Sequence, residues 1–274
     1  MFLITGSNGQ LGTALAFYLK DQAQYIDKET LDLTNEEEVK SFFEKKQYDF
    51  VINCAAYTAV DKAEEDIETA YKVNALAPKY LAKYAKNIIH ISTDYVFDGK
   101  GCIPYTEDIT PTPLSVYGQT KREGEINALE QADTAIIIRT SWLYSPHGTN
   151  FVKTIRKLGS ERSSLNVIFD QIGTPTNAYD LAEAITKIIP QITPNEKGIY
   201  HFSNEGVCSW YDFAQEIIEQ SNLNCQIFPI ESKDYKTLAK RPFYSVLNKN
   251  KIKQRFNLVI PHWKEGLKRC LKQF

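Results

Sequence analysis

The feature that most constrains the fold of this chain is a glycine triplet close to its beginning. Gly6, Gly9 and Gly12 are spaced as G-x-x-G-x-x-G, directly after the short apolar run 2–4. The segment that follows, 11–20, carries leucines at helical spacing. A strand, a tight glycine turn and an amphipathic helix in this order predict the first unit of a nucleotide-binding α/β fold.

Each glycine of the triplet has a distinct expected role. Gly6 permits the tight turn, Gly9 lets the backbone approach a pyrophosphate, and Gly12 allows the helix to pack closely on the strand. Gln10 and Leu11 open the helix, so their backbone N–H groups belong to the same cradle. We therefore predict that Gly6, Gly9, Gln10, Leu11 and Gly12 bind a dinucleotide.

The first half of the chain alternates between strand-like and helix-like periods. The expected strands are 2–4, 25–26, 50–53, 88–92 and 135–139, and the expected helices are 11–20, 35–46, 67–86 and 116–129. Strands that are apolar on both faces and alternate with helices are typical of a parallel sheet covered on both sides. The predicted fold class is therefore α/β, with a doubly wound, Rossmann-type parallel sheet.

The second half reads as a smaller lobe. With 274 residues, the chain is long enough for one large domain or two that share a cleft. We predict a dinucleotide-binding domain over 1–145, to which elements around 178–203 return. A substrate-binding lobe, interleaved with these elements, then covers most of 146–274.

Composition excludes several classes of function. The net charge is −2 and no basic cluster stands out, which argues against a nucleic-acid partner. No apolar run is long enough to span a membrane, and the N-terminus does not resemble a signal peptide. The five cysteines form no Cys-x-x-Cys pair and the four histidines lie far apart, so we predict no metal ligands and a cytoplasmic location.

An acidic residue lies where the ribose of a dinucleotide is expected. Asp27 comes 21 positions after Gly6, and an acid at this distance favours NAD. Lys28 follows directly and could instead accept a 2′-phosphate. Asp32 and Leu33, near the return to the sheet, could bracket the adenine, so the choice between NADH and NADPH stays open.

A tyrosine and a lysine indicate a reduction. Tyr117 and Lys121 are four residues apart on a predicted helix, so their side chains share one face. Thr93 ends the strand that precedes them. A phenol can protonate the alkoxide that hydride transfer leaves on a ketone. We expect an ammonium at about 4 Å to lower the phenol's pKa by about three units. These three residues are the predicted catalytic group.

Longer strings extend this pattern over the whole chain. The glycine loop, Thr93 and the pair Tyr117 and Lys121 resemble the extended short-chain dehydrogenase/reductase family. Within this family, the chain resembles the dTDP-4-dehydrorhamnose reductases over residues 51–64, 92–99, 139–144, 150–152, 170–176 and 241–247. The resemblance implies reduction of the 4-keto group of dTDP-4-dehydro-6-deoxy-L-mannose by NADPH or NADH, giving dTDP-L-rhamnose for cell-surface polysaccharides.

The same resemblance implies roles for single residues. Tyr117 would donate the proton, Lys121 would also hold the nicotinamide ribose, and Thr93 would contact the reacting sugar oxygen. The remaining expected contacts are with the dinucleotide (Ala55, Ala56, Tyr57) and with the dTDP-sugar (Asp94, Trp142, Arg241). Some family members are described with magnesium, but no acidic cluster here maps to such a site.

Other interpretations stay open at this stage. A nucleotide-sugar dehydratase would carry Thr-Asp-Glu at the strand end, whereas this chain has Thr93, Asp94 and Tyr95. Another nucleotide-sugar reductase or epimerase, or a non-catalytic dinucleotide-binding regulatory subunit, would share much of the pattern. A homodimer is one alternative for the assembly. The acidic stretch 61–66 is expected to be a solvated helix start.

Overall fold

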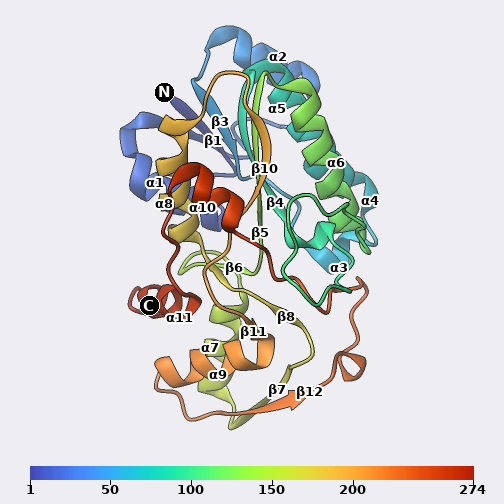
Figure 1. Ribbon diagram of the computed structural model, residues 1–274, viewed down its shortest axis with the longest axis vertical. Coiled ribbons are helices and arrows are strands. Elements are labelled where there is room, and N and C mark those ends of the chain that lie inside the picture. Colours follow the sequence, from blue (N-terminus) through green and yellow to red (C-terminus); the bar gives the residue numbers. More distant parts are fainter.

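A six-stranded parallel sheet forms the centre of the molecule. The computed structural model describes residues 1–274, and its main sheet has the order β10-β5-β4-β3-β1-β2 (Figure 1). The strands are β1 (Phe2–Thr5), β2 (Ala23–Ile26), β3 (Phe50–Asn53), β4 (Asn87–Thr93), β5 (Thr134–Thr140) and β10 (Lys197–His201). Every neighbouring pair is parallel, as the apolar strand segments predict. The predicted fold class is confirmed.

Successive strand residues point to opposite faces, and each face is covered by its own helices. Leu3 and Ile88 belong to one buried cluster, whereas Ile4 and Ile89 belong to the other. One face packs against α1 (Gln10–Leu19), α8 (Ala178–Ile188) and α10 (Asn250–Phe256). The other packs against α2 (Glu36–Lys45), α5 (Ala77–Ala85) and α6 (Val116–Gln131).

A second group of elements lies beyond the carboxyl ends of the strands (Figure 1). Its helices are α7 (Phe151–Glu161), α9 (Trp210–Gln220) and α11 (Trp263–Leu271). Its short strands are β6 (Leu143–Tyr144), β7 (Ser164–Ile168), β8 (Ile172–Gly173), β9 (Thr176–Asn177), β11 (Cys208–Ser209) and β12 (Gln226–Ile230). The three helices share a third apolar cluster around Phe213 and Trp263. Because α8 and β10 return to the main sheet, this lobe is interleaved with the part of the chain that forms that sheet.

The helix expected over 67–86 is interrupted. It consists of α4 (Ile67–Tyr71), one π-helical turn (Lys72–Leu76) and α5, which has Pro78 in its first turn. Proline has no N–H to donate, so the wider turn accommodates it without ending the helix. The irregular turn also frees the Asn74 side chain, which accepts from the Tyr57 N–H at 2.8 Å.

None of the helices is both long and apolar enough to cross a membrane.

Candidate active site

A cavity of about 1110 Å³ lies between the two lobes. It opens at the carboxyl ends of β1, β3 and β4. The chain turns from one side of the sheet to the other between β1 and β3, the place where doubly wound sheets bind ligands. All residues that the sequence singles out for binding or catalysis line it: Gly6, Gly9, Gln10, Leu11, Gly12, Asp27, Asp32, Leu33, Ala55, Ala56, Tyr57, Thr93, Asp94, Tyr117, Lys121, Trp142 and Arg241.

The glycine loop has no space for side chains. Gly6 has φ +65°, in the left-handed region, and a Cβ there would lie 2.7 Å from the Ala55 nitrogen. A Cβ on Gly12 would lie 2.4 Å from the Gly6 carbonyl oxygen. The loop, the start of α1 and the end of β3 are therefore in direct contact, which only glycine allows.

The start of α1 is suited to an anion. Gly9 occupies the capping position, and no side chain accepts from the first turn of this helix. Free N–H groups at a helix start, together with the helix dipole, attract phosphate. The residues of this loop therefore fit the pyrophosphate of a dinucleotide. The Gln10 side chain has another role: it accepts from Asn150 at 2.8 Å and so links α1 to the second lobe.

The acidic residues expected near the ribose and adenine follow β2. Asp27 accepts from the side chain of Asn8 and, at 3.0 Å, from the Glu29 N–H. Hydrogen bonds from the Thr34 hydroxyl and N–H lower the pKa of Asp32. Lys28 lines the cavity beside Asp27, so both a ribose acceptor and a cation for a 2′-phosphate are at hand.

Local sequence places Tyr117 beside Thr93. The Ser115 side chain caps α6 by accepting from the Gly118 N–H at 3.1 Å. A Cβ on Gly118 would lie 2.2 Å from the Tyr95 carbonyl oxygen, so only glycine lets the helix approach this close. The Tyr117 ring then packs edge-on against Tyr95, with 5.4 Å between centroids. Together, the cap and the close approach of Gly118 place the phenol at the end of β4.

The pKa of Tyr117 departs from the expectation. Burial raises it to about 12, the contact with Thr93 lowers it and the nearby Asp94 carboxylate raises it. We expected Lys121 to lower this pKa. Instead, the Lys121 ammonium donates to the Ile91 carbonyl oxygen at 2.5 Å, and burial lowers its own pKa to about 8. At neutral pH the phenol is therefore protonated and can act as a proton donor.

Thr93 and Asp94 form a buried pair at the end of β4. The Thr93 hydroxyl donates to Asp94 Oδ1 at 3.1 Å and accepts from the Tyr95 N–H at 3.2 Å. Burial raises the pKa of Asp94 to about 6, although the Ser245 and Thr93 hydroxyls oppose this shift. Asp94 Oδ2 is buried without a partner, on the wall of the cavity. A buried acceptor of this kind is suited to a hydroxyl of a ligand.

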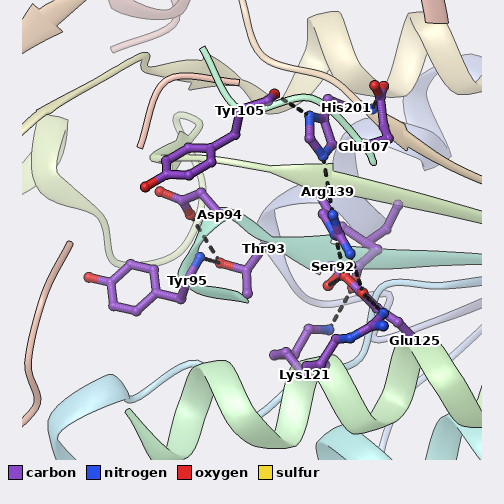
Figure 2. A network of polar contacts seen from close by, with 12 residues as sticks. Ser92, Thr93, Asp94, Tyr95, Tyr105, Glu107, Lys121, Glu125, Arg139 and His201 are labelled. Atoms are coloured by element: carbon purple, nitrogen blue, oxygen red, sulfur yellow. Dashed lines mark hydrogen bonds and ion pairs between the residues drawn. The ribbon is translucent and has the colours of Figure 1, made fainter. Parts of the chain in front are cut away.

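Behind Lys121 lies a fully buried ion pair, which Figure 2 shows. Glu125 accepts two hydrogen bonds from Arg139, each of 2.7 Å, and both side chains are 0% exposed. The same carboxylate also accepts from Ser92 at 2.6 Å. On its other side, Arg139 Nη1 lies 3.4 Å from His201 Nε2. The pair ties α6 to β4 and β5, and so fixes the helix that carries Tyr117 and Lys121.

Trp142 lies on the cavity wall in a strained conformation. Its φ is +49°, and its ring stacks on Trp210 with 3.5 Å between centroids. Residues in the left-handed region often mark functional sites. Trp210 also lines the cavity. The sequence did not predict this, because Trp210 lies 68 positions after Trp142 and no motif surrounds it.

The expectation that the acidic stretch 61–66 is a solvated helix start holds for Asp66, which is exposed, but it is wrong for Asp61 and Glu64. Asp61 accepts from the Ala239 N–H and from Arg241, each at 3.0 Å. Glu64 accepts from the Val116 N–H at 2.9 Å, and the Asp66 side chain caps α4. The sequence gives no sign of the contacts of Asp61, because Ala239 and Arg241 lie 178 and 180 positions further along the chain.

No group of three or more His, Cys, Asp or Glu side chains is arranged to hold a metal ion.

These features define a class of protein. A parallel sheet of this order, a glycine loop at its switch point and a Thr–Tyr–Lys group beside it characterise Rossmann-type oxidoreductases of the extended short-chain dehydrogenase/reductase type. The model of the family described as RmlD substrate binding domain matches residues 1–274. The chain belongs to this family.

Individual relatives agree over almost the whole length. The chain is 42% identical over 286 residues to a dTDP-4-dehydrorhamnose reductase of Aggregatibacter actinomycetemcomitans, covering 97% of this chain and 96% of that protein. A crystal structure of a dTDP-4-dehydrorhamnose reductase from Clostridium acetobutylicum superposes with a TM-score of 0.95 at 42% identity, covering 99% of this chain and 98% of that one. A crystal structure of the Bacillus anthracis dTDP-4-dehydrorhamnose reductase in complex with NADP superposes with a TM-score of 0.95 at 38% identity, covering 100% of this chain and 99% of that one.

Proposed function

We propose that this chain is a dTDP-4-dehydrorhamnose reductase, which reduces the 4-keto group of dTDP-4-dehydro-6-deoxy-L-mannose to give dTDP-L-rhamnose. The observation that carries the proposal is the position of Thr93, Tyr117 and Lys121 on the wall of the cavity that also contains the glycine loop. The relatives named above, two of them at 42% identity, support the choice of substrate.

We assign the cofactor to one part of the cavity. The glycine loop would hold the pyrophosphate, Asp27, Lys28, Asp32 and Leu33 would surround the adenosine, and Ala55–Tyr57 would line the rest. The donor set is compatible with NADPH and with NADH. When bound, the reduced nicotinamide supplies a hydride to the carbonyl carbon.

The residues of this chain would then handle the proton. Reduction leaves negative charge on the former carbonyl oxygen, and Tyr117, protonated because its pKa is about 12, would donate to it. The Thr93 hydroxyl accepts from the Tyr95 N–H, and its single hydrogen, which Asp94 Oδ1 accepts in the absence of ligand, would turn to the same oxygen. Lys121 would hold the nicotinamide ribose with the N–H groups that Ile91 does not use.

We assign the substrate to the opposite wall. Trp142 would contact the thymidine diphosphate portion with its aromatic face, Asp94 a sugar hydroxyl, and Arg241 the diphosphate. In this proposal, 1–145 with the returning elements around 178–203 forms the dinucleotide-binding domain. Most of 146–274 supplies the substrate lobe.

Turnover by the purified protein tests this proposal. We expect absorbance at 340 nm to fall when NADPH or NADH is mixed with dTDP-4-dehydro-6-deoxy-L-mannose, and dTDP-L-rhamnose to appear in equal amount. Parallel titrations with the two cofactors would establish the preference. A folded protein that binds the cofactor but produces no dTDP-L-rhamnose would instead support a regulatory subunit.

A further inference from the structure

One segment of the second lobe runs back along the rim of the cavity. Residues 239–248, here called the rim segment, follow β12 after a 3₁₀ turn (Ser232–Asp234) and pass α3 (Val60–Ala63) before α10 (Figure 1). The segment carries Arg241, which lines the cavity. Its only regular backbone pairing is two isolated bridges, at Tyr244 and Leu247, so its position depends on its contacts with the rest of the chain.

Several backbone contacts hold the middle of the rim segment. The Tyr244 N–H donates to the Gly99 carbonyl at 3.1 Å, and the Ser245 N–H donates to the Ile172 carbonyl at 2.8 Å. A Cβ on Gly99 would lie 2.5 Å from Pro242. These contacts fix the backbone on the C-terminal side of Arg241, but none of them orients its guanidinium.

Asp61 is the residue that reaches the guanidinium. Its Oδ1 accepts from the Ala239 N–H and its Oδ2 accepts from Arg241 Nη2, both at 3.0 Å. One carboxylate therefore holds both the backbone two residues before the arginine and the end of the arginine itself. The two side chains are 39% and 30% exposed, so the contact lies at the rim rather than in the core.

The remaining part of the guanidinium is incompletely satisfied. Arg241 Nε is buried and has no partner in the protein. An arginine whose outer nitrogen is held by a carboxylate, while another N–H is buried without an acceptor beside a cavity, is ready for an anionic ligand. Its planar fork suits the adjacent oxygens of a diphosphate.

We infer that Asp61 is a positioning residue for the nucleoside diphosphate: it holds the rim segment and orients Arg241 toward the diphosphate of the substrate. The inference rests on the proposed function, because it takes Arg241 as the diphosphate contact. Pre-orientation helps because an unrestrained arginine would lose its side-chain freedom only when the ligand binds.

The test compares Asp61→Asn with Glu65→Gln, a control that removes the same charge from the same acidic stretch. Glu65 is exposed, and its side chain makes no hydrogen bond or ion pair. We expect Asp61→Asn to raise the KM for the dTDP-keto sugar about three- to ten-fold, since an exposed ion pair and one hydrogen bond are each modest. The kcat, the KM for the cofactor and the melting temperature should stay close to those of the control.

A double-variant cycle shows whether Asp61 acts through Arg241. Arg241→Met should itself raise the KM for the sugar nucleotide, and adding Asp61→Asn to it should have little further effect. Asp61→Glu, which keeps the charge, should recover part of the affinity. If Asp61→Asn leaves the KM unchanged, or if its effect is undiminished beside Arg241→Met, the inference is wrong.

Calorimetric titration with dTDP separates this inference from the proposed function. The dissociation constant for dTDP should rise in Asp61→Asn and not in Glu65→Gln, whether or not the wild type reduces the keto sugar. Absence of turnover with this pattern intact would overturn the reductase assignment alone. Equal dTDP affinity in the wild type and Asp61→Asn, or no binding of dTDP at all, would overturn the role of Asp61.

Discussion

We expect the buried ammonium of Lys121 to lower the free energy of unfolding of the protein. Its side chain is 1% exposed, and burial lowers its pKa from 10.5 to about 8. Each pKa unit corresponds to about 1.4 kcal/mol, so the charged form is disfavoured in the folded state by about 3 kcal/mol. Replacement by methionine removes the ammonium and keeps most of the stem.

The variant Lys121→Met should therefore be more stable than the wild type at neutral pH. Loss of the hydrogen bond to the Ile91 carbonyl costs about 1 kcal/mol, which leaves a net gain of about 2 kcal/mol. For a chain of this size that is a rise in melting temperature of about 4 °C or more. The same variant should lose most of its activity and bind the cofactor less tightly.

The destabilisation by Lys121 should depend on pH. The folded-state pKa of Lys121 lies below its unfolded value, so the destabilisation is fully present below pH 8 and disappears as the pH rises toward 10.5. Three titratable groups interact with the ammonium: Glu125 on its own helix, Cys54 after β3 and His90 on β4. Those that titrate over this range are present in both proteins, so the comparison between them isolates Lys121.

Urea and thermal unfolding at pH 7 and pH 10 measure this difference. The control is Lys157→Met, which removes an exposed lysine on α7 that forms no ion pair. The gain in Lys121→Met should shrink between pH 7 and pH 10, whereas the control should show no such change. A Lys121→Met protein that is less stable than the wild type at pH 7, or a gap that does not depend on pH, would refute the reasoning.

Three further predictions concern the same site. Tyr117→Phe should lower kcat by about 10² to 10⁴ and leave the cofactor dissociation constant unchanged, and a variant with more than a third of the wild-type kcat would contradict the proton-donor role. Gly9→Val should abolish dinucleotide binding in a folded protein, because the branched side chain would occupy the space that the pyrophosphate needs at the start of α1; calorimetry measures this, and unchanged affinity would count against the pyrophosphate cradle. Glu125→Gln should destabilise the protein by about 3 to 5 kcal/mol in urea unfolding, since it leaves Arg139 buried without its counter-charge, and a loss under 1 kcal/mol would be inconsistent with the buried pair.

Much of the nucleotide-binding half is predictable because its signals are local. The glycine spacing, the apolar strands and the four-residue step from Tyr117 to Lys121 each depend on neighbours in the chain. The interruption before Pro78 is the exception, because a proline can end a helix or be accommodated by a wider turn. Which of these happens depends on packing, here on the contact of Asn74 with Tyr57.

The pKa values in the site depend on tertiary contacts, and the expectation for Tyr117 is wrong for this reason. The spacing of Tyr117 and Lys121 suggested that the ammonium lowers the phenol's pKa, but the pKa of a group depends on its burial and on all of its partners. Burial is the largest contribution to the pKa shift of both residues. The Lys121 ammonium donates its hydrogen bond to the carbonyl of Ile91, 30 positions earlier in the chain.

The sequence by itself determined the fold class, the glycine cradle and the residue types available for catalysis, because these follow from periodicity and from what each side chain can do. Only the tertiary structure decided that Asp61 meets Arg241 and that Glu125 meets Arg139. The first pair spans 180 positions of the chain. Contacts of this kind leave no periodic signal, since they form only when the packing of separate elements brings two side chains together.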